Sequence, residues 1–380
     1  MRELKDITPA CPLSAEEFAD LVRASIPPQV KGYGQMRFSR AGGVATGSLL
    51  VREDGAAALA GTAGATAGTA AQSSRHVCAI GAFDGVHCGH KALLARARAE
   101  ADAREAALVV VTFSPDPSRV LAPSNKGCDL LSIENRVRFL AASTPDALAI
   151  VDFTPELASL SFDRFVREVL ESTGSELSAI VVGSNFRLGA QGAGDVVALA
   201  DLGQADGFDV VGMELIDEGG QAISATRLRA LLSEGCVERA SALLGRCYVV
   251  QGTCVHGRGK GSTFGFPTAN VAVNQDACLP AEGVYAGFLV YGGRAWPAAV
   301  NVGHSRTFEP GAEGEPFLEA TLLGFEGDLY GQDVLVGFMR WLREPRHFSS
   351  VEELVSTVQG NVEWVRSALG DAGVEVGEAA

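Results

Sequence analysis

The pattern of apolar and polar positions changes twice along the chain. Up to about residue 75 it is weak, apart from a capping-box-like Ser-Ala-Glu-Glu run at 14–17 before Phe18, which predicts a short helix ending by Pro27. Residues 55–74 are nearly all Ala, Gly and Thr, with little apolar surface to bury. They are therefore predicted to form a loop or linker.

From His76 to about residue 215, short apolar runs alternate with amphipathic stretches. The runs predict buried strands at 77–83, 108–113, 148–153, 179–182 and 209–215. The intervening stretches predict helices at 91–106, 133–142 and 161–173. Such alternation is typical of a doubly wound α/β fold, a parallel sheet covered on both faces, in which ligands bind at the carboxyl ends of the strands.

After about residue 244 the pattern becomes a series of strand-like runs separated by glycine-rich turns. These runs lie at 249–255, 284–291, 295–302, 317–325 and 334–342. They predict a small antiparallel β-barrel. Residues 351–369 keep apolar positions at helical spacing and predict a terminal helix packed on the barrel. Residues 228–244 are predicted to join the two halves as helix and turn.

The length of 380 residues suits two domains, because domains usually run about 100–200 residues. We expect an extension with its linker at 1–75, a first catalytic domain at 76–235, a second at 236–370 and a tail at 371–380.

The charge balance restricts the class of partner. Lys and Arg number 31 against 46 Asp and Glu, a formal charge of −15, which argues against a nucleic-acid binder but not against binding of a single nucleotide. No apolar run reaches the length of about 18 residues that a membrane span needs, and residues 1–13 have no apolar signal core. The sequence predicts a cytoplasmic protein without membrane or nucleic-acid partners.

The first candidate site lies where a predicted strand ends and a predicted helix begins. His87 and His90 stand at this helix start, where free N–H groups and positive potential suit a triphosphate. Gly81 and Gly89 allow close approach of the backbone. The alternatives are histidines that only cap the helix or lie on the surface, and a metal site of His87, Cys88 and His90.

The second candidate site combines a glycine-rich loop with a Pro-Thr-Ala-Asn run at 267–270. The N–H groups of such a loop can cradle phosphates, although its spacing is not that of a Walker A loop, and a plain β-turn is the alternative. Thr268 and Asn270 place two neutral oxygens on one side of an extended segment, which suits Mg²⁺. Glu319 is a carboxylate in a mostly apolar run, and burying it is unfavourable unless it is paired or has a chemical role. The alternative is that Glu319 is a surface charge on an edge strand.

Both sites resemble one known family. The Gly-x-Phe-Asp-Gly-Val-His-x-Gly-His stretch at 81–90 resembles the HxGH nucleotidyltransferase superfamily, and specifically the adenylyltransferase module of bacterial bifunctional riboflavin kinase/FAD synthetases. Two later runs, at 182–189 and 223–229, resemble further motifs of that module. The Gly-x-Pro-Thr-Ala-Asn signature, the Leu-Glu-Ala run at 318–320 and the Asp-Leu-Tyr-Gly run at 328–331 resemble its riboflavin kinase module.

The resemblance implies a bifunctional enzyme whose substrates are riboflavin, FMN and ATP and whose cofactor is Mg²⁺. Riboflavin is phosphorylated to FMN by the C-terminal domain, and FMN is adenylylated to FAD by the N-terminal domain. The implied catalytic residues are His87, His90 and Glu319, the last as general base. The implied ATP contacts are Gly81, Phe83, Asp84, Gly89, Ser224, Thr226, Arg229, Gly257, Gly259 and Gly261. The implied flavin contacts are Asn185, Phe186 and Phe113, and the implied metal ligands are Thr268 and Asn270.

Three positions depart from the pattern of the family. Asp116 replaces a frequent His, Ala225 replaces the second Ser of its motif, and Arg306 replaces the usual Pro. Three alternatives therefore stay open: an enzyme that retains only one activity, such as the riboflavin kinase, a non-catalytic flavin-binding regulator, and another HxGH enzyme. The Pro-Thr-Ala-Asn run discriminates against the last of these.

Overall fold

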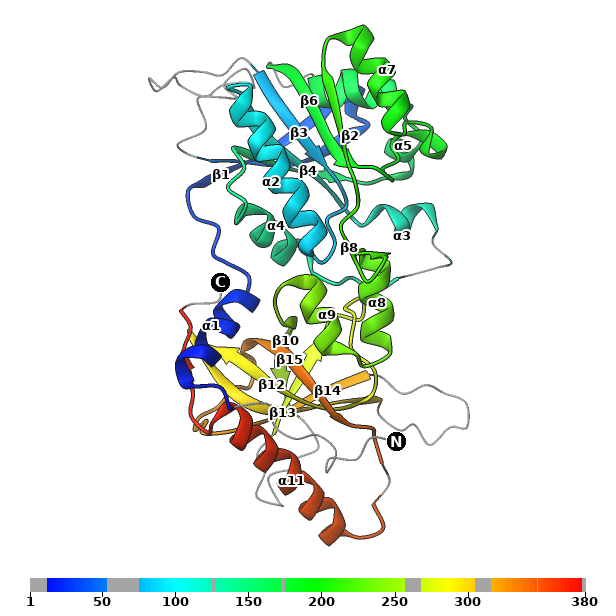
Figure 1. The fold of residues 1–380 in the computed structure, drawn as a ribbon. Coiled ribbons are helices and arrows are strands. Elements are labelled where there is room, and N and C mark those ends of the chain that lie inside the picture. The colour runs from blue at the N-terminus through cyan, green and yellow to red at the C-terminus, as the bar shows by residue number, and fades with distance from the viewer. Residues whose placement is uncertain are drawn as a thin grey trace. The chain divides into compact units, whose positions relative to one another are not determined.

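The computed structural model describes residues 12–52, 75–122, 124, 127–171, 175–256, 268–304, 316–346 and 348–377. The chain forms two compact units. One spans Val30–Ser224, and the other combines residues up to Gln29 with residues from Ala225 onward (Figure 1). A compact unit need not coincide with a catalytic domain, so the domain boundaries expected at 75, 235 and 370 stay predictions. The linker predicted at 55–74 lies outside the described residues.

A seven-stranded sheet forms the centre of the Val30–Ser224 unit, in the order β1-β2-β5-β4-β3-β6-β7. Its parallel strands are β3 (Arg75–Ile80), β4 (Ala107–Ser114), β5 (Ala147–Asp152), β6 (Glu176–Gly183) and β7 (Asp209–Met213). The hairpin of β1 (Tyr33–Arg40) and β2 (Ala45–Arg52), joined by the short helix η2 (Ala41–Gly43), adds to the edge at β5 in antiparallel direction. The predicted parallel sheet is confirmed, whereas the weak pattern before residue 75 did not predict the hairpin.

Helices cover both faces of this sheet. On one face, α2 (Cys88–Ala103) and α4 (Ile133–Ala141) share a buried apolar cluster with β3 and β4. The other face carries α5 (Pro155–Ala158), α6 (Phe162–Phe165), the π-helical turn η4 (Val166–Leu170) and α7 (Val196–Asp206). The doubly wound arrangement is therefore confirmed. The smaller elements are α3 (Pro117–Leu121), η6 (Ala190–Gly192), β8 (Asp217–Glu218) and β9 (Gln221–Ala222).

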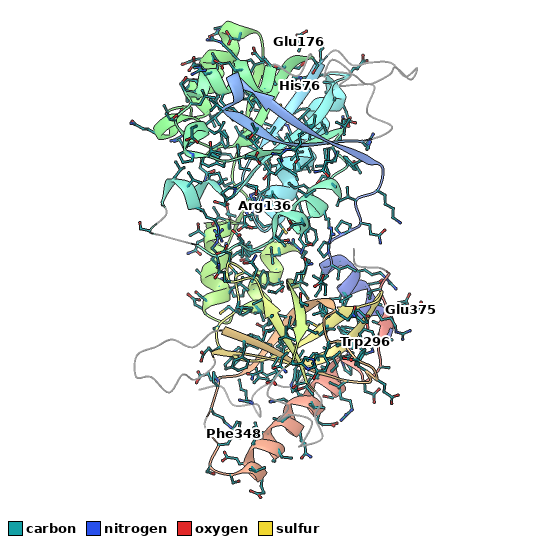
Figure 2. The ribbon with its side chains drawn as sticks, turned by 180° about the vertical axis from the view of Figure 1, so that it is seen from behind. His76, Arg136, Glu176, Trp296, Phe348 and Glu375 are labelled. Atoms are coloured by element: carbon teal, nitrogen blue, oxygen red, sulfur yellow. The ribbon has the colours of Figure 1, made fainter. Side chains whose placement is uncertain are left out.

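A closed antiparallel barrel forms the centre of the other unit. Its strands are β10 (Tyr248–Val255), β11 (Thr268–Val273), β12 (Gly283–Tyr291), β13 (Arg294–His304), β14 (Pro316–Leu322) and β15 (Asp333–Arg343). Their order is β12-β15-β10-β11-β14-β13, and pairing of β12 with β13 closes the barrel. The short strand β16 (Val374–Glu375) pairs with the start of β13, near Trp296 (Figure 2). The predicted small barrel is confirmed.

Among the described residues from Ala225 onward, the helices are α8 (Ala225–Ser233), α9 (Val237–Leu244) and α11 (Val351–Leu369). The last has the predicted bounds, and it buries Val362, Val365 and Leu369 in the same apolar cluster as the barrel. The predicted terminal helix is therefore confirmed. None of the described helices combines the length and the apolar character needed to cross a membrane.

The N-terminal helix α1 (Ala15–Ser25) completes the core of the barrel unit. It begins at the predicted capping box, in which the side chains of Ser14 and Glu17 each bond the backbone of the other. Phe18 and Val22 are fully buried, and the Phe18 ring packs edge to face on Phe288 of β12 with ring centroids 6.2 Å apart. A segment far from the barrel in sequence thus forms part of its hydrophobic core.

Candidate active sites

The turn between β3 and α2 has an unusual backbone. Strand β3 ends at Ile80, earlier than the predicted end at 83, because the chain then turns with positive φ at Phe83 (53°), Gly85 (80°) and Val86 (39°). For residues other than glycine such conformations cost about 1–3 kcal/mol each, and they persist only where the surrounding structure enforces them. The turn is therefore held by its neighbours rather than by its own preference.

The two predicted catalytic histidines meet at the start of α2. His87 is the N-cap, and its Nδ1 accepts a hydrogen bond from the backbone N–H of His90 at 3.3 Å. The two rings stack with centroids 3.6 Å apart, and the His90 ring packs edge to face on Phe83 at 5.2 Å. A neutral imidazole that accepts a hydrogen bond at Nδ1 carries its proton on Nε2, so it has no second lone pair for a metal, and this bond argues against the alternative metal site.

The glycines of this segment are required by the ring positions. A Cβ atom at Gly89 would lie 3.1 Å from Nδ1 of His87, and one at Gly81 would lie 3.1 Å from the Phe83 ring. Both distances are shorter than ordinary contacts, so a side chain at either position would displace a ring. Each glycine therefore leaves room for a neighbouring ring, and the ATP contacts predicted for Gly81 and Gly89 stay predictions.

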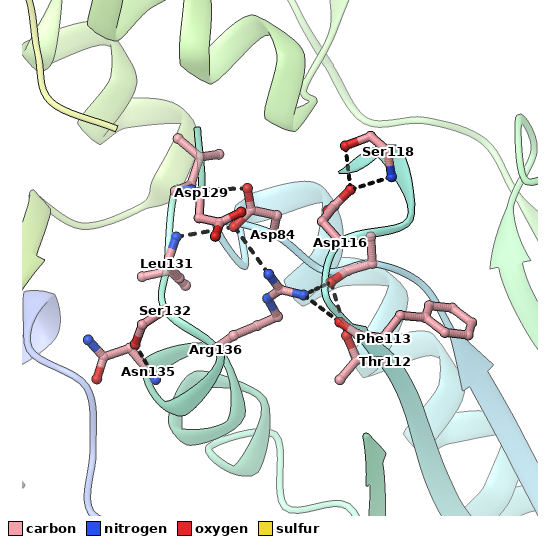
Figure 3. A network of polar contacts seen from close by, with 12 residues as sticks. Asp84, Thr112, Phe113, Asp116, Ser118, Asp129, Leu131, Ser132, Asn135 and Arg136 are labelled. Carbon is pink, nitrogen blue, oxygen red and sulfur yellow. Dashed lines mark hydrogen bonds and ion pairs between the residues drawn. The ribbon is translucent and has the colours of Figure 1, made fainter. Parts of the chain in front are cut away.

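Asp84 points into the protein rather than toward a ligand. Its side chain is 2% exposed, and its carboxylate oxygens accept hydrogen bonds from the backbone N–H groups of Leu130 (3.0 Å) and Leu131 (3.1 Å) (Figure 3). The guanidinium of Arg136 lies 3.8 Å from the same carboxylate. The ATP contact predicted for Asp84 stays a prediction, and its carboxylate is engaged by these three groups.

The predicted flavin contacts follow strands that neighbour β3. Asn185 and Phe186 lie in the turn after β6, where Asn185 is exposed and Phe186 packs at the rim of the buried cluster. Phe113 lies near the end of β4, is 4% exposed and packs edge to face on Phe153 at 5.5 Å. Because β4, β3 and β6 are adjacent and parallel, the three strand ends share one edge of the sheet. The flavin roles stay predictions.

Two of the three positions that depart from the family pattern, Asp116 and Ala225, lie in the described residues. The Asp116 carboxylate caps α3, accepting hydrogen bonds from the backbone N–H of Ser118 at 2.9 Å and from its hydroxyl at 2.7 Å. Ala225 is the first residue of α8, directly after Ser224. Thr226 and Arg229 follow in the same helix, so the phosphate contacts predicted for these three residues belong to one helix start.

The kinase residues come together on the barrel. Glu319 of β14 is the direct cross-strand partner of Asn270 on β11 and of Asn301 on β13. The Thr268 hydroxyl donates a hydrogen bond to Oε1 of Glu319 at 3.0 Å. Directly opposed residues project to the same face of a sheet, so the predicted base and both predicted metal ligands share one face.

Glu319 is not an edge-strand charge, because β14 pairs on both sides. Its chain neighbours Leu318 and Ala320 are buried, whereas Glu319 itself is half-buried on the opposite face. Asn301 belongs to this group although the sequence analysis did not propose it as a site residue. Its signal in the sequence was the Asn-Val-Gly run at 301–303, which resembles an Asn-Ile-Gly segment of the riboflavin kinase module. Gly257, Gly259, Gly261 and Arg306 lie outside the described residues.

Comparison with known proteins identifies the family of each half of the chain. A family model described as FAD synthetase matches residues 69–227, and one described as riboflavin kinase matches residues 244–369. A bifunctional riboflavin kinase/FMN adenylyltransferase of Escherichia coli K12 is 34% identical over 74% of this chain and 89% of its own length. The protein of the same name from Listeria monocytogenes is 33% identical over 74% of this chain and 89% of its own length. The chain belongs to the bifunctional riboflavin kinase/FMN adenylyltransferase family.

A solved structure has a similar fold over most of the chain. The crystal structure of a macrolide-efflux protein from Streptococcus pneumoniae is 29% identical, with a TM-score of 0.70, and the alignment covers 79% of this chain and 95% of that chain. The predicted fold class and family are confirmed, and with the family its two ATP-using transfers, riboflavin to FMN and FMN to FAD. The riboflavin kinase match to the barrel removes the alternative of another HxGH enzyme. Residues 1–68, which include α1, lie outside both family models.

Proposed function

We propose that the barrel phosphorylates riboflavin with Glu319 as general base, and that the turn and helix start at residues 81–90 catalyse the adenylylation of FMN. The observation that carries the proposal is the position of Glu319 between Asn270 and Asn301, with the Thr268 hydroxyl 3.0 Å from its carboxylate. In the sequence Glu319 is a single acidic residue in an apolar run, whereas in the fold it shares one face of the barrel sheet with the side chains of Thr268 and Asn270.

In the kinase step, the terminal ribityl hydroxyl of riboflavin attacks the γ-phosphorus of ATP. The new O–P bond forms as the bond to ADP breaks, and Glu319 accepts the hydroxyl proton. Phosphoryl transfer needs mainly positioning and neutralisation of charge. The hydroxyl of Thr268 and the amide oxygen of Asn270 are hard donors that fit Mg²⁺, and these two residues would hold it. The ion, when bound, neutralises charge on the phosphate oxygens.

In the adenylylation step, a phosphate oxygen of FMN attacks the α-phosphorus of a second ATP and pyrophosphate leaves. Negative charge develops beside the N-terminus of α2, where backbone N–H groups and the rings of His87 and His90 are available to donate. The resemblance of the motif at 223–229 implies that Ser224, Thr226 and Arg229 are further phosphate contacts. Neither step requires a covalent enzyme intermediate.

We place both steps in the cytoplasm. Each step consumes ATP, which the cytoplasm supplies. The formal charge of −15 also favours solubility, because molecules of like charge repel one another.

The direct test is to incubate the purified chain with riboflavin, ATP and Mg²⁺ and to separate the flavins by chromatography over time. We expect FMN to appear first and FAD later, and neither to form when Mg²⁺ is removed with a chelator. FMN without FAD, even when FMN is supplied, would leave a riboflavin kinase alone. Tight binding of riboflavin without any conversion would instead establish a non-catalytic flavin-binding protein.

A further inference from the structure

Arg136 is a buried cation that belongs to none of the motifs. It lies in the first turns of α4 with its side chain 3% exposed. A buried charge is unfavourable unless it is paired and hydrogen-bonded, so its presence in the interior calls for an explanation in terms of its contacts.

These contacts lead to the turn before the histidines and to the end of the neighbouring strand β4. One guanidinium nitrogen, Nη1, donates to the carbonyl of Ala82 and to the carbonyl of Phe113, both at 3.0 Å. The other, Nη2, lies 3.8 Å from Oδ1 of Asp84. Figure 3 shows the guanidinium between the β3–α2 turn and the end of β4. Arg136 therefore connects two adjacent strand ends and the turn.

The Ala82 carbonyl is held from a second direction. The Thr112 hydroxyl donates to it at 3.0 Å, so this single oxygen accepts two hydrogen bonds from side chains. Asp84, two residues further on, is fixed by Leu130 and Leu131 as well as by Arg136. Between these two anchored residues lies Phe83, the first residue of the turn with positive φ.

The anchored turn touches the histidine pair. The Phe83 ring packs edge to face on His90, and His90 stacks on His87. A contiguous series of contacts thus runs from Arg136 through Ala82 and Asp84 to Phe83 and the two histidines. A lysine could satisfy one of these acceptors, but it lacks the planar fork that reaches two carbonyls and a carboxylate together.

We propose that Arg136 is a positioning residue for adenylyl transfer, which holds the strained turn after β3 in the conformation that sets His87 and His90. The inference rests on the proposed role of the histidine pair in that step. Because loose geometry mainly slows the chemical step, we expect the loss of Arg136 to lower kcat more than it raises KM.

The test compares Arg136→Met, Arg136→Lys and the matched control Arg96→Met in the full chain. Arg96 is half-exposed on α2, and its ion pair is with Glu100, one turn along the same helix. We expect Arg136→Met to lower kcat for FMN adenylylation about 10- to 100-fold with KM for ATP and FMN within about threefold. Arg136→Lys should be intermediate, and Arg96→Met and every variant's riboflavin phosphorylation should match the parent chain.

Hydrogen exchange, measured by mass spectrometry of peptides, separates positioning from general destabilisation. In Arg136→Met we expect faster exchange in peptides covering 81–91 and unchanged exchange in β5, β6 and the barrel. An unchanged kcat would overturn the proposal, and so would faster exchange throughout Val30–Ser224, because Arg136 would then support the whole unit. A His90→Gln variant with full adenylylation would refute the proposed site itself, whatever the result for Arg136.

Discussion

Thr268 and Glu319 are joined across neighbouring barrel strands by a 3.0 Å hydrogen bond from Oγ1 to Oε1. The bond links a residue of the Pro-Thr-Ala-Asn run to a carboxylate 51 positions away in sequence. Because both residues lie on hydrogen-bonded strands, the orientation of the carboxylate is fixed by the sheet before any substrate binds.

Replacing Glu319 by Gln tests its role as base. Gln keeps the size of the side chain and an oxygen that can accept from Thr268, but it cannot take up the ribityl proton. We expect kcat for riboflavin phosphorylation to fall about 100- to 10,000-fold, while adenylylation of supplied FMN is unchanged. Glu326→Gln, at an exposed position on the turn after β14, is the matched control. A loss of less than about tenfold would refute the role of base.

Replacing Thr268 by Val tests the predicted metal site. Val has the shape of Thr without the hydroxyl, so the variant removes one oxygen donor and leaves the packing of β11 nearly unchanged. We expect the Mg²⁺ concentration that gives half-maximal kinase activity to rise about 10- to 100-fold, measured from initial rates at fixed ATP. Thr268→Ser retains the hydroxyl and should stay near the parent value. Identical Mg²⁺ dependence in Val and Ser variants would exclude Thr268 as a ligand.

The packing of α1 makes a prediction about stability. Phe18 is fully buried against the barrel although it lies outside both matched family regions. Phe-to-Ala replacements in cores cost about 3–5 kcal/mol, so Phe18→Ala should lose kinase activity at a distinctly lower temperature. Adenylylation should lose less of its thermal tolerance, because His87 and His90 lie in the Val30–Ser224 unit, although Thr226 and Arg229 belong to the same unit as the barrel. The measurement is the residual rate of each reaction after heating.

The control for this experiment is Glu16→Ala, an exposed position on the same helix. It should leave the inactivation temperatures of both reactions in place. If Phe18→Ala behaved like this control, α1 would not contribute to the stability of the barrel. Equal loss of both activities would mean instead that the two units unfold together.

The α1 helix also shows what the sequence could and could not reveal. Its start was predictable because a capping box is a local signal, contained in residues 14–17. Its place in the core was not predictable, because the partner Phe288 lies 270 positions further along the chain. Likewise the motifs identified Thr268 and Glu319 one by one, and only the strand register showed Asn301 beside them.

The burial of Arg136 was also not predictable from the sequence. In sequence it is one of two arginines in a short amphipathic helix, where a cation ordinarily faces water. Its burial depends on the carbonyls of Ala82 and Phe113 and on the carboxylate of Asp84. The motif at 81–90 includes Asp84, but no local pattern pairs it with Arg136. The turn itself was predicted as a strand end, because apolar residues continue to Phe83 and positive φ leaves no trace in an apolar pattern.

His76 gives the Val30–Ser224 unit a predictable response to acid. It lies on β3 (Figure 2), is fully buried, and has its Nδ1 2.7 Å from the hydroxyl of Ser175. Burial lowers the pKa of His76 from its ordinary 6.5 to about 4. Between these two pH values the imidazole is protonated in the unfolded chain but neutral in the folded chain. The contribution of His76 to folding stability is therefore fully present above pH 6.5 and is lost as the pH falls toward 4.

Each pH unit within this range should weaken the unit by about 1.4 kcal/mol through His76 alone. Replacing His76 by Gln retains a polar group of similar size that does not titrate, so the variant should lose less stability between pH 7 and pH 5 than the parent chain does. The measurement is the adenylylation rate that remains after incubation at each pH and return to neutral conditions, with riboflavin phosphorylation as the internal control. If parent and variant lost adenylylation over the same pH range, another group would control the acid sensitivity, and the buried imidazole would have no part in it.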